Sequence, residues 1–327
     1  MRKNVTKTLL MGTLLAVAAV GAGCTKEPDL AKEKMEQAFL KQSEAAAYSF
    51  SGKATMNIQL PSEGAGKNLI ASALKGMLTK GTLEWSGAAT YEPVRLEAEL
   101  KSTPEGSTTA MALPLLFKDN KLYLQLPLLG KQNESFSLDM AELSSLSGQT
   151  SPFTQDSLKA AGKLVSEAFR LLIADMDAKW FATVEDTVQA DGSKLPVYRL
   201  EITEKNKSEI EAAIKGKLPE LIDRLSAAGI AGDDQVQSLK SAAAGFVLQA
   251  PGEISVAVDQ TGFVRRENLQ LTFSGTGAGG ASAANSIKLE QSFADINGTP
   301  AFKQEPPANA RSLGDILKLL MPQTKQK

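Results

Sequence analysis

Few side chains in this chain of 327 residues could do covalent chemistry, because it contains no histidine and a single cysteine, Cys24. Without an imidazole there is no Ser-His-Asp triad, no Cys-His dyad and no HExxH zinc site. Carboxylates, lysines and serines remain, but no two carboxylates stand out as the facing pair that a glycosidase needs. The composition predicts a protein that is not an enzyme and that uses neither a metal nor a cofactor.

A glycine-rich segment, Gly275 to Gly280, formally matches the dinucleotide-binding pattern GxGxxG and follows a predicted strand. That function also needs a helix that opens at the glycines and a parallel strand after it. Residues 281–285 are too short for this helix. We therefore expect residues 274–286 to form a flexible loop and not a nucleotide site.

Two pairs of acids could in principle bind a cation, namely Asp175 with Asp177 and Asp233 with Asp234. Neither pair has the spacing of an EF-hand loop. Both lie where helix ends normally carry solvated carboxylates. The spacing predicts surface acids and no metal site.

Cys24 ends a segment that is typical of an export signal. Residues 2–7 include three basic side chains, residues 8–20 are apolar and uncharged, and residues 21–23 are small. This order predicts a signal peptide over residues 1–23, cleaved before Cys24. The alternative, a membrane-spanning anchor, is less favoured because the uncharged run has 13 residues and a bilayer needs roughly 20.

The cleavage junction resembles the lipobox of bacterial lipoproteins, in which a peptidase cuts before a cysteine that carries diacylglycerol. It departs from that pattern at Gly21, where the family prefers leucine. The resemblance implies that Cys24 is lipidated, that residues 24–29 are a tether, and that the protein is anchored to the bacterial cell membrane outside the cytoplasm. The alternative for Cys24 is a buried free thiol. Removal of residues 1–23 leaves a net charge of −4, which gives no electrostatic reason to expect nucleic acid as a partner.

Alternation of apolar and polar residues predicts most of the mature chain to be strands. The clearest case runs from Tyr48 to Leu60, where the even positions are apolar or glycine and the odd positions are polar. Such a period of two gives a strand with one dry face and one wet face. Similar patterns and turn signals recur in residues 83–91, 94–101, 108–117, 121–126, 180–189, 195–203, 254–258, 263–273 and from about 287 to 293. We expect about ten strands in a meandering antiparallel sheet, because few neighbours are separated by a helix.

Helical patterns supply the only cover for the apolar face of this sheet. A helix is predicted after Asp29, and a capping box at Ser208 and Glu211 is predicted to open another, which Gly216 and Pro219 break in two. Residues 67–79 are expected to form a helix that is either a lid over the core or, as the alternative, a mobile gate or membrane-touching segment. The remaining helices are expected at residues 156–176, 234–246 and, capped by Ser312, at the C-terminus. Together these elements predict an α+β fold.

The order of these elements resembles the lipoprotein-localisation-factor fold shared by LolA, LolB, LppX and LprG. The segments that carry the resemblance are Ala47 to Gly52, Leu116 to Leu124, Val258 to Phe263, Phe293 to Pro300 and Gln304 to Pro307. The resemblance implies a strongly curved antiparallel half-barrel whose concave face is covered by amphipathic helices, with lipid held between them. It implies a single domain over residues 30–327, ending in a C-terminal amphipathic helix.

The anchor, the absent histidine and the apolar face together predict a membrane-anchored protein that binds or carries a lipid or acyl chain without catalysis. The alternative is a structural, interaction or sensory lipoprotein of the cell envelope, with a protein partner and no lipid cargo. If a cavity exists between sheet and helices, we expect its wall to include Met56, Ile58, Leu74, Met77, Leu83, Trp85, Leu124 and Leu172.

Overall fold

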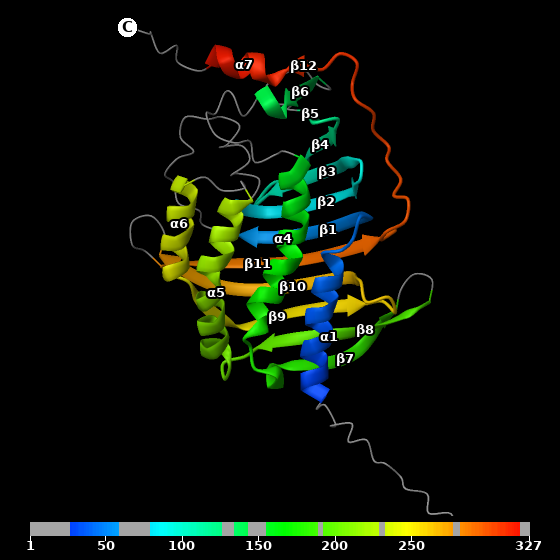
Figure 1. Cartoon of the computed structure of the whole chain (residues 1–327). Coiled ribbons are helices and arrows are strands. Elements are labelled where there is room, and N and C mark those ends of the chain that lie inside the picture. The colour runs from blue at the N-terminus through cyan, green and yellow to red at the C-terminus, as the bar shows by residue number, and fades with distance from the viewer. Residues whose placement is uncertain are drawn as a thin grey trace, which may run out of the picture.

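The computed structural model describes residues 27–58, 79–125, 134–142, 155–188, 192–228, 233–276 and 282–320. These residues form one open sheet of twelve strands in the order β12-β6-β5-β4-β3-β2-β1-β11-β10-β9-β8-β7, with helices on one face (Figure 1). The strands are β1 (Ala47–Asn57), β2 (Lys80–Tyr91), β3 (Val94–Pro104), β4 (Met111–Lys118), β5 (Lys121–Gln125), β6 (Ser135–Asp139), β7 (Phe181–Val188), β8 (Lys194–Ile202), β9 (Val247–Val258), β10 (Val264–Thr276), β11 (Ser282–Ala294) and β12 (Arg311–Ser312). The predicted α+β half-barrel, not closed into a full barrel, is confirmed.

The sheet is antiparallel except at one edge, where the short β12 pairs with β6 in parallel. Its centre joins segments that are far apart in the sequence, because β1 lies between β2 and β11. The register places the even residues of β1 beside the odd residues of β2 and β11, so that Gly52 lies between Trp85 and Gln291. These positions share the face that is turned toward the helices.

The helices pack mainly over one half of the sheet, from β7 to β11 (Figure 1). They are α1 (Glu27–Gln42), α4 (Gln155–Ala174), α5 (Lys207–Ala227), α6 (Asp233–Ala244) and α7 (Leu313–Leu320), with the 3-10 turn η1 (Ala178–Trp180) before β7. The buried residues of α1 are Ala31, Met35, Ala38, Phe39 and Gln42, a spacing that keeps one helical stripe against the core. The ammonium of Lys32 donates to the carbonyls of Ala174 and Met176, at 2.6 and 2.8 Å, and so fixes the end of α4 against α1.

Four details of the sequence prediction are wrong. Helix α5 runs unbroken through Pro219, and its predicted capping box does not form, because Glu211 instead accepts a hydrogen bond from the backbone N–H of Leu248 at 2.9 Å. The expected loop over residues 274–286 is shorter, since β10 reaches Thr276 and β11 starts at Ser282. The strand count was also too low, because β6 and β12 are only 5 and 2 residues long.

After β11 an extended strap, defined as residues 298–310, leads from the sheet centre back to its far edge (Figure 1). The buried carboxylate of Glu97 accepts hydrogen bonds from the backbone N–H groups of Lys303 and Gln304, both at 2.8 Å. The guanidinium of Arg95 lies 4.3 Å from the centre of the Phe302 ring. Beyond the strap, Ser312 caps α7 by accepting from the N–H of Asp315 at 3.1 Å, as predicted.

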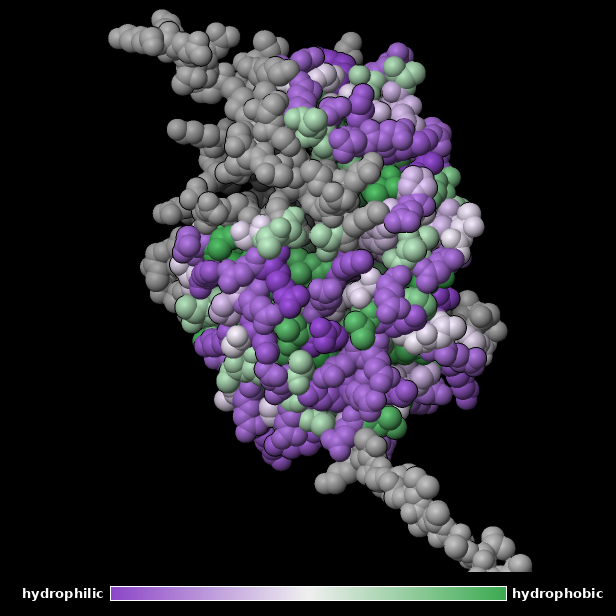
Figure 2. Space-filling view, viewed as in Figure 1, coloured by the Kyte–Doolittle hydropathy of each residue, from purple (hydrophilic) through white to green (hydrophobic). Residues whose placement is uncertain are grey.

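The helical side of the molecule presents mostly hydrophilic residues, with small separate hydrophobic patches between them (Figure 2). Large buried apolar side chains gather instead between helices and sheet, in a cluster that includes Met35, Phe39, Ile173 and Val256. A search of the described helices finds none that is both long and apolar enough to cross a bilayer.

Candidate functional site

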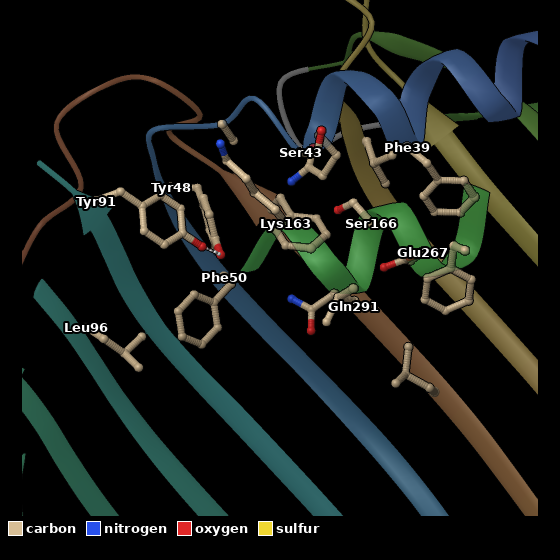
Figure 3. A pocket seen from close by; sticks show the side chains of 17 residues that line it. Phe39, Ser43, Tyr48, Phe50, Tyr91, Leu96, Lys163, Ser166, Glu267 and Gln291 are labelled. Carbon is tan, nitrogen blue, oxygen red and sulfur yellow. Dashed lines mark hydrogen bonds between the residues drawn. The ribbon is translucent and has the colours of Figure 1, made fainter. Parts of the chain in front are cut away.

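A cavity of about 310 Å³ lies between the end of α1, the middle of α4 and strands β1, β2, β3, β10 and β11 (Figure 3). Its size is at the lower end of the range usual for ligand pockets. It is lined by Phe39, Gln42, Ser43, Ala45, Tyr48, Phe50, Tyr91, Leu96, Lys163, Val165, Ser166, Phe169, Val264, Glu267, Leu289, Gln291 and Phe293.

The helical wall follows from the stripe on each helix. Phe39 and Gln42 extend the buried stripe of α1 by its last turn, while Lys163, Ser166 and Phe169 succeed one another on one side of α4. The rings of Phe39 and Phe169 stack with their centres 5.2 Å apart and an angle of 10° between their planes. This stacking holds the two helices together at the cavity.

The sheet wall is a cluster of aromatic rings that converge from three strands. Tyr48 contacts Phe293 edge to face with ring centres 5.6 Å apart, and its hydroxyl lies 3.0 Å from that of Tyr91. Burial raises the pKa of both phenols, so they stay protonated and can share a hydrogen bond. The ring of Phe50 completes this cluster, 6.0 Å from that of Tyr48.

Two glycines let aromatic rings lie flat on the sheet beside this cavity. A Cβ on Gly52 would lie 2.5 Å from the indole of Trp85, which crosses β1 and donates to Oε1 of Gln291 at 2.6 Å. At Gly87 a Cβ would come within 2.7 Å of the Phe50 ring. The glycines therefore set the positions of Phe50 and Gln291 in the wall, an arrangement in which an aromatic ring packs over a strand glycine.

Two polar side chains in the wall have unused bonding capacity. Glu267 lines the cavity from β10, and burial raises the pKa of its carboxyl to about 7. None of the described residues donates a hydrogen bond to this carboxyl or forms an ion pair with it. Gln42 is 9% exposed, and its Oε1 is buried without a hydrogen-bond partner in the same part of the structure.

The structure does not place the residues predicted for the wall in this cavity. Met56, Leu83, Trp85 and Leu124 are half-buried and share the helix-facing side of the sheet. Ile58 follows β1, and Leu172 lies on α4, both half-buried. None of these six is among the lining residues, although Trp85 supports Gln291. Cys24, Leu74 and Met77 lie outside the described residues, as does most of the segment 67–79.

Some residues of the cavity wall could have been recognised from the sequence. Tyr48 and Phe50 stand on the dry face of the clearest predicted strand, and Phe39 on the apolar face of the first helix. Glu267 has a sharper signal, because it shares its strand parity with Leu269 and Leu271, which pack against the core. A lone acid in an apolar series is the pattern that would have found it.

This arrangement is suited to binding a ligand. Apolar walls with a few convergent polar groups and a carboxyl of raised pKa are typical of ligand sites. Within the described residues no three or more Cys, Asp or Glu side chains come together as a metal site would require.

No protein-family model matches the chain, and no curated protein matches it. Among solved structures, the crystal structure of LprF from Mycobacterium bovis is similar to it, with 11% sequence identity and a TM-score of 0.39. The match covers 85% of this chain and 97% of that chain.

Proposed function

We propose that the protein is a lipid-anchored extracytoplasmic lipoprotein that holds a lipid or acyl chain in the cavity between α1, α4 and the sheet, without a covalent step. The observation that carries this proposal is the cavity itself, whose wall includes six aromatic rings. They are Phe39, Tyr48, Phe50, Tyr91, Phe169 and Phe293.

The energetics favour an apolar occupant. Protein interiors are close-packed, and a cavity lined by apolar groups lowers the stability of the fold unless something fills it. A ligand that buries apolar surface there gains about 25 cal/mol per Å². The wall itself needs little rearrangement to receive it, because the ring pairs and the Trp85–Gln291 hydrogen bond already fix its side chains.

The proposed anchor keeps this cavity near a membrane. Cys24 precedes the first residue of α1, Glu27, by three positions, so an extended tether spans about 10 Å at most. The cavity lies at the other end of α1, whose 16 residues cover about 24 Å. The binding site therefore lies at most about 34 Å from the anchored cysteine.

Native mass spectrometry of the protein purified from membranes tests the proposal. We expect a co-purifying lipid. Two equally exposed valines provide a matched pair of variants, since Val165 is 58% exposed and lines the cavity while Val188 is 59% exposed and does not. Val165→Trp should reduce the bound lipid by filling the cavity, and Val188→Trp should leave it unchanged.

Absence of lipid from the unmodified protein would contradict the proposal, as would equal lipid content in the two tryptophan variants. Cross-linking in intact cells then becomes the deciding measurement. A trapped protein partner would favour the alternative of an interaction or sensory lipoprotein of the envelope.

A further inference from the structure

The proposed function leaves open which head group the cavity accepts, and the unused polar groups of the wall bear on this question. Gln42 is nine-tenths buried and its Oε1 accepts no hydrogen bond. Glu267 offers two more acceptor oxygens and receives no donor from the described residues. An acceptor that is removed from water without a donor is costly, so an occupant that covers the half-buried Glu267 gains affinity by supplying donors. The Oε1 atom of Gln42 is itself fully buried, so Gln42 accepts from an occupant once its amide turns toward the cavity.

Figure 3 shows the side chains of Glu267, Ser166 and Gln291 turned toward the same space between α4 and the sheet. The amide of Gln291 is already engaged, because its Oε1 accepts from Trp85 and its Nε2 donates to the carbonyl of Ser292. The side chains that still lack a hydrogen-bond donor are therefore Glu267 and Gln42.

The charged side chains of the wall further limit which head group the cavity can accept. Lys163 of α4 is the one other charged side chain among the described lining residues; α1 contributes Gln42, and β11 contributes Gln291. A cationic head group would be repelled by this ammonium, and an anionic head group would be repelled by the Glu267 carboxylate. An anionic head held at the exposed Lys163 would leave both acceptors against the acyl chain, without donors.

We propose that the cavity selects single-chain amphiphiles whose head group is uncharged and bears hydroxyl donors, as the glycerol of a monoacylglycerol does, with Glu267 and Gln42 as the accepting residues. This inference rests on the proposed function. It adds to it the chemical class of the head group and the residues that recognise it.

Binding of two probes with the same acyl chain tests the inference. Monodecanoylglycerol and decanoate are titrated at pH 8 into the full-length protein freed of bound lipid, by isothermal calorimetry. At this pH Glu267 is mostly ionised, since burial raises the pKa of its carboxyl to about 7. We expect the glycerol ester to bind at least about tenfold more tightly, as hydrogen bonds to a charged acceptor imply.

Three variants test which residues cause the preference for the glycerol ester over decanoate. Glu267→Gln should reduce it to about threefold or less, because the amide neither repels decanoate nor accepts as strongly. Gln42→Leu, which removes the second acceptor, should weaken binding of the ester and leave binding of decanoate unchanged. Glu105→Gln, at an exposed turn after β3, should change nothing. A melting curve of each variant confirms that it is folded.

Equal affinity for the two probes, tighter binding of decanoate, or an unchanged ratio in Glu267→Gln would overturn the inference and leave the proposed function standing. Failure of both probes to bind, together with absence of lipid from the membrane-purified protein, would overturn the proposed function and this inference with it.

Discussion

Replacement of Glu267 by glutamine should make the ligand-free protein more stable, by an amount that grows as the pH rises from about 4.5 to about 7 and is constant above this range. The carboxyl has a pKa of about 7 in the folded protein, against an ordinary value of 4.5. Between these two values the folded state holds a proton that the unfolded state has released, so stability falls as pH rises through this window. A difference of about 2.5 pH units, at 1.36 kcal/mol each, amounts to about 3 kcal/mol at pH 8.

No imidazole titrates in this window. The chain has no histidine, and hydrogen bonds and ion pairs with Lys215 and Lys118 lower the pKa values of Glu211 and Glu305, respectively, although burial opposes both shifts. Those two carboxyls therefore finish titrating below the window. The contribution of Glu267 is the difference between the unmodified protein and Glu267→Gln in the change of stability from pH 5 to pH 8.

Urea unfolding at pH 5 and pH 8, followed by circular dichroism, measures the effect. The unmodified protein should lose up to about 3 kcal/mol of unfolding free energy at the higher pH, and Glu267→Gln should lose little. Glu105→Gln, which changes an exposed carboxyl, should behave like the unmodified protein. Equal stability of the unmodified protein at both pH values, or an undiminished loss in Glu267→Gln, would refute the reasoning.

Three further predictions concern other parts of the chain. Gly52→Ala should cost about 1–3 kcal/mol and change tryptophan fluorescence, because its Cβ would displace the indole of Trp85; unchanged emission and urea midpoint would contradict this. Glu97→Ala should cost about 2–3 kcal/mol by leaving two strap N–H groups without their acceptor, and limited proteolysis should then cleave the strap sooner than in the matched exposed-site variant Glu99→Ala. Cys24→Ala should move the protein from the membrane to the soluble fraction, and its persistence in the membrane pellet would count against lipidation.

The sequence predicted the sheet better than the site. Strict alternation identified β1 because one of its faces is dry along its whole length, and register then aligned its neighbours. Breaks in helices were harder to predict than strands. Pro219 lies within α5, because tertiary context can override the low helix propensity of proline. The short β6 and β12 are held by pairing across the chain, which local patterns do not record.

The cavity escaped prediction because apolar residues look alike whether they face a ligand or one another. Met56 and Leu83 share the correct face of the sheet, yet they lie away from the described cavity. Where a cavity opens depends on how far α1 and α4 stand from the strands, and no spacing in the sequence encodes that distance. Polar residues in apolar series, Gln42 on α1 and Glu267 on β10, are the better guide.

The pairing of β1 with β11 has a consequence for how the chain reaches its final form. Ser49 lies opposite Ala294, so the middle of the sheet closes only when nearly the whole polypeptide is present, and such non-local contacts form slowly. For a chain that enters the cell envelope through its N-terminal segment, as proposed here, the first strand emerges long before its partner. The apolar faces of the intervening strands then stay without their full cover until β11 arrives.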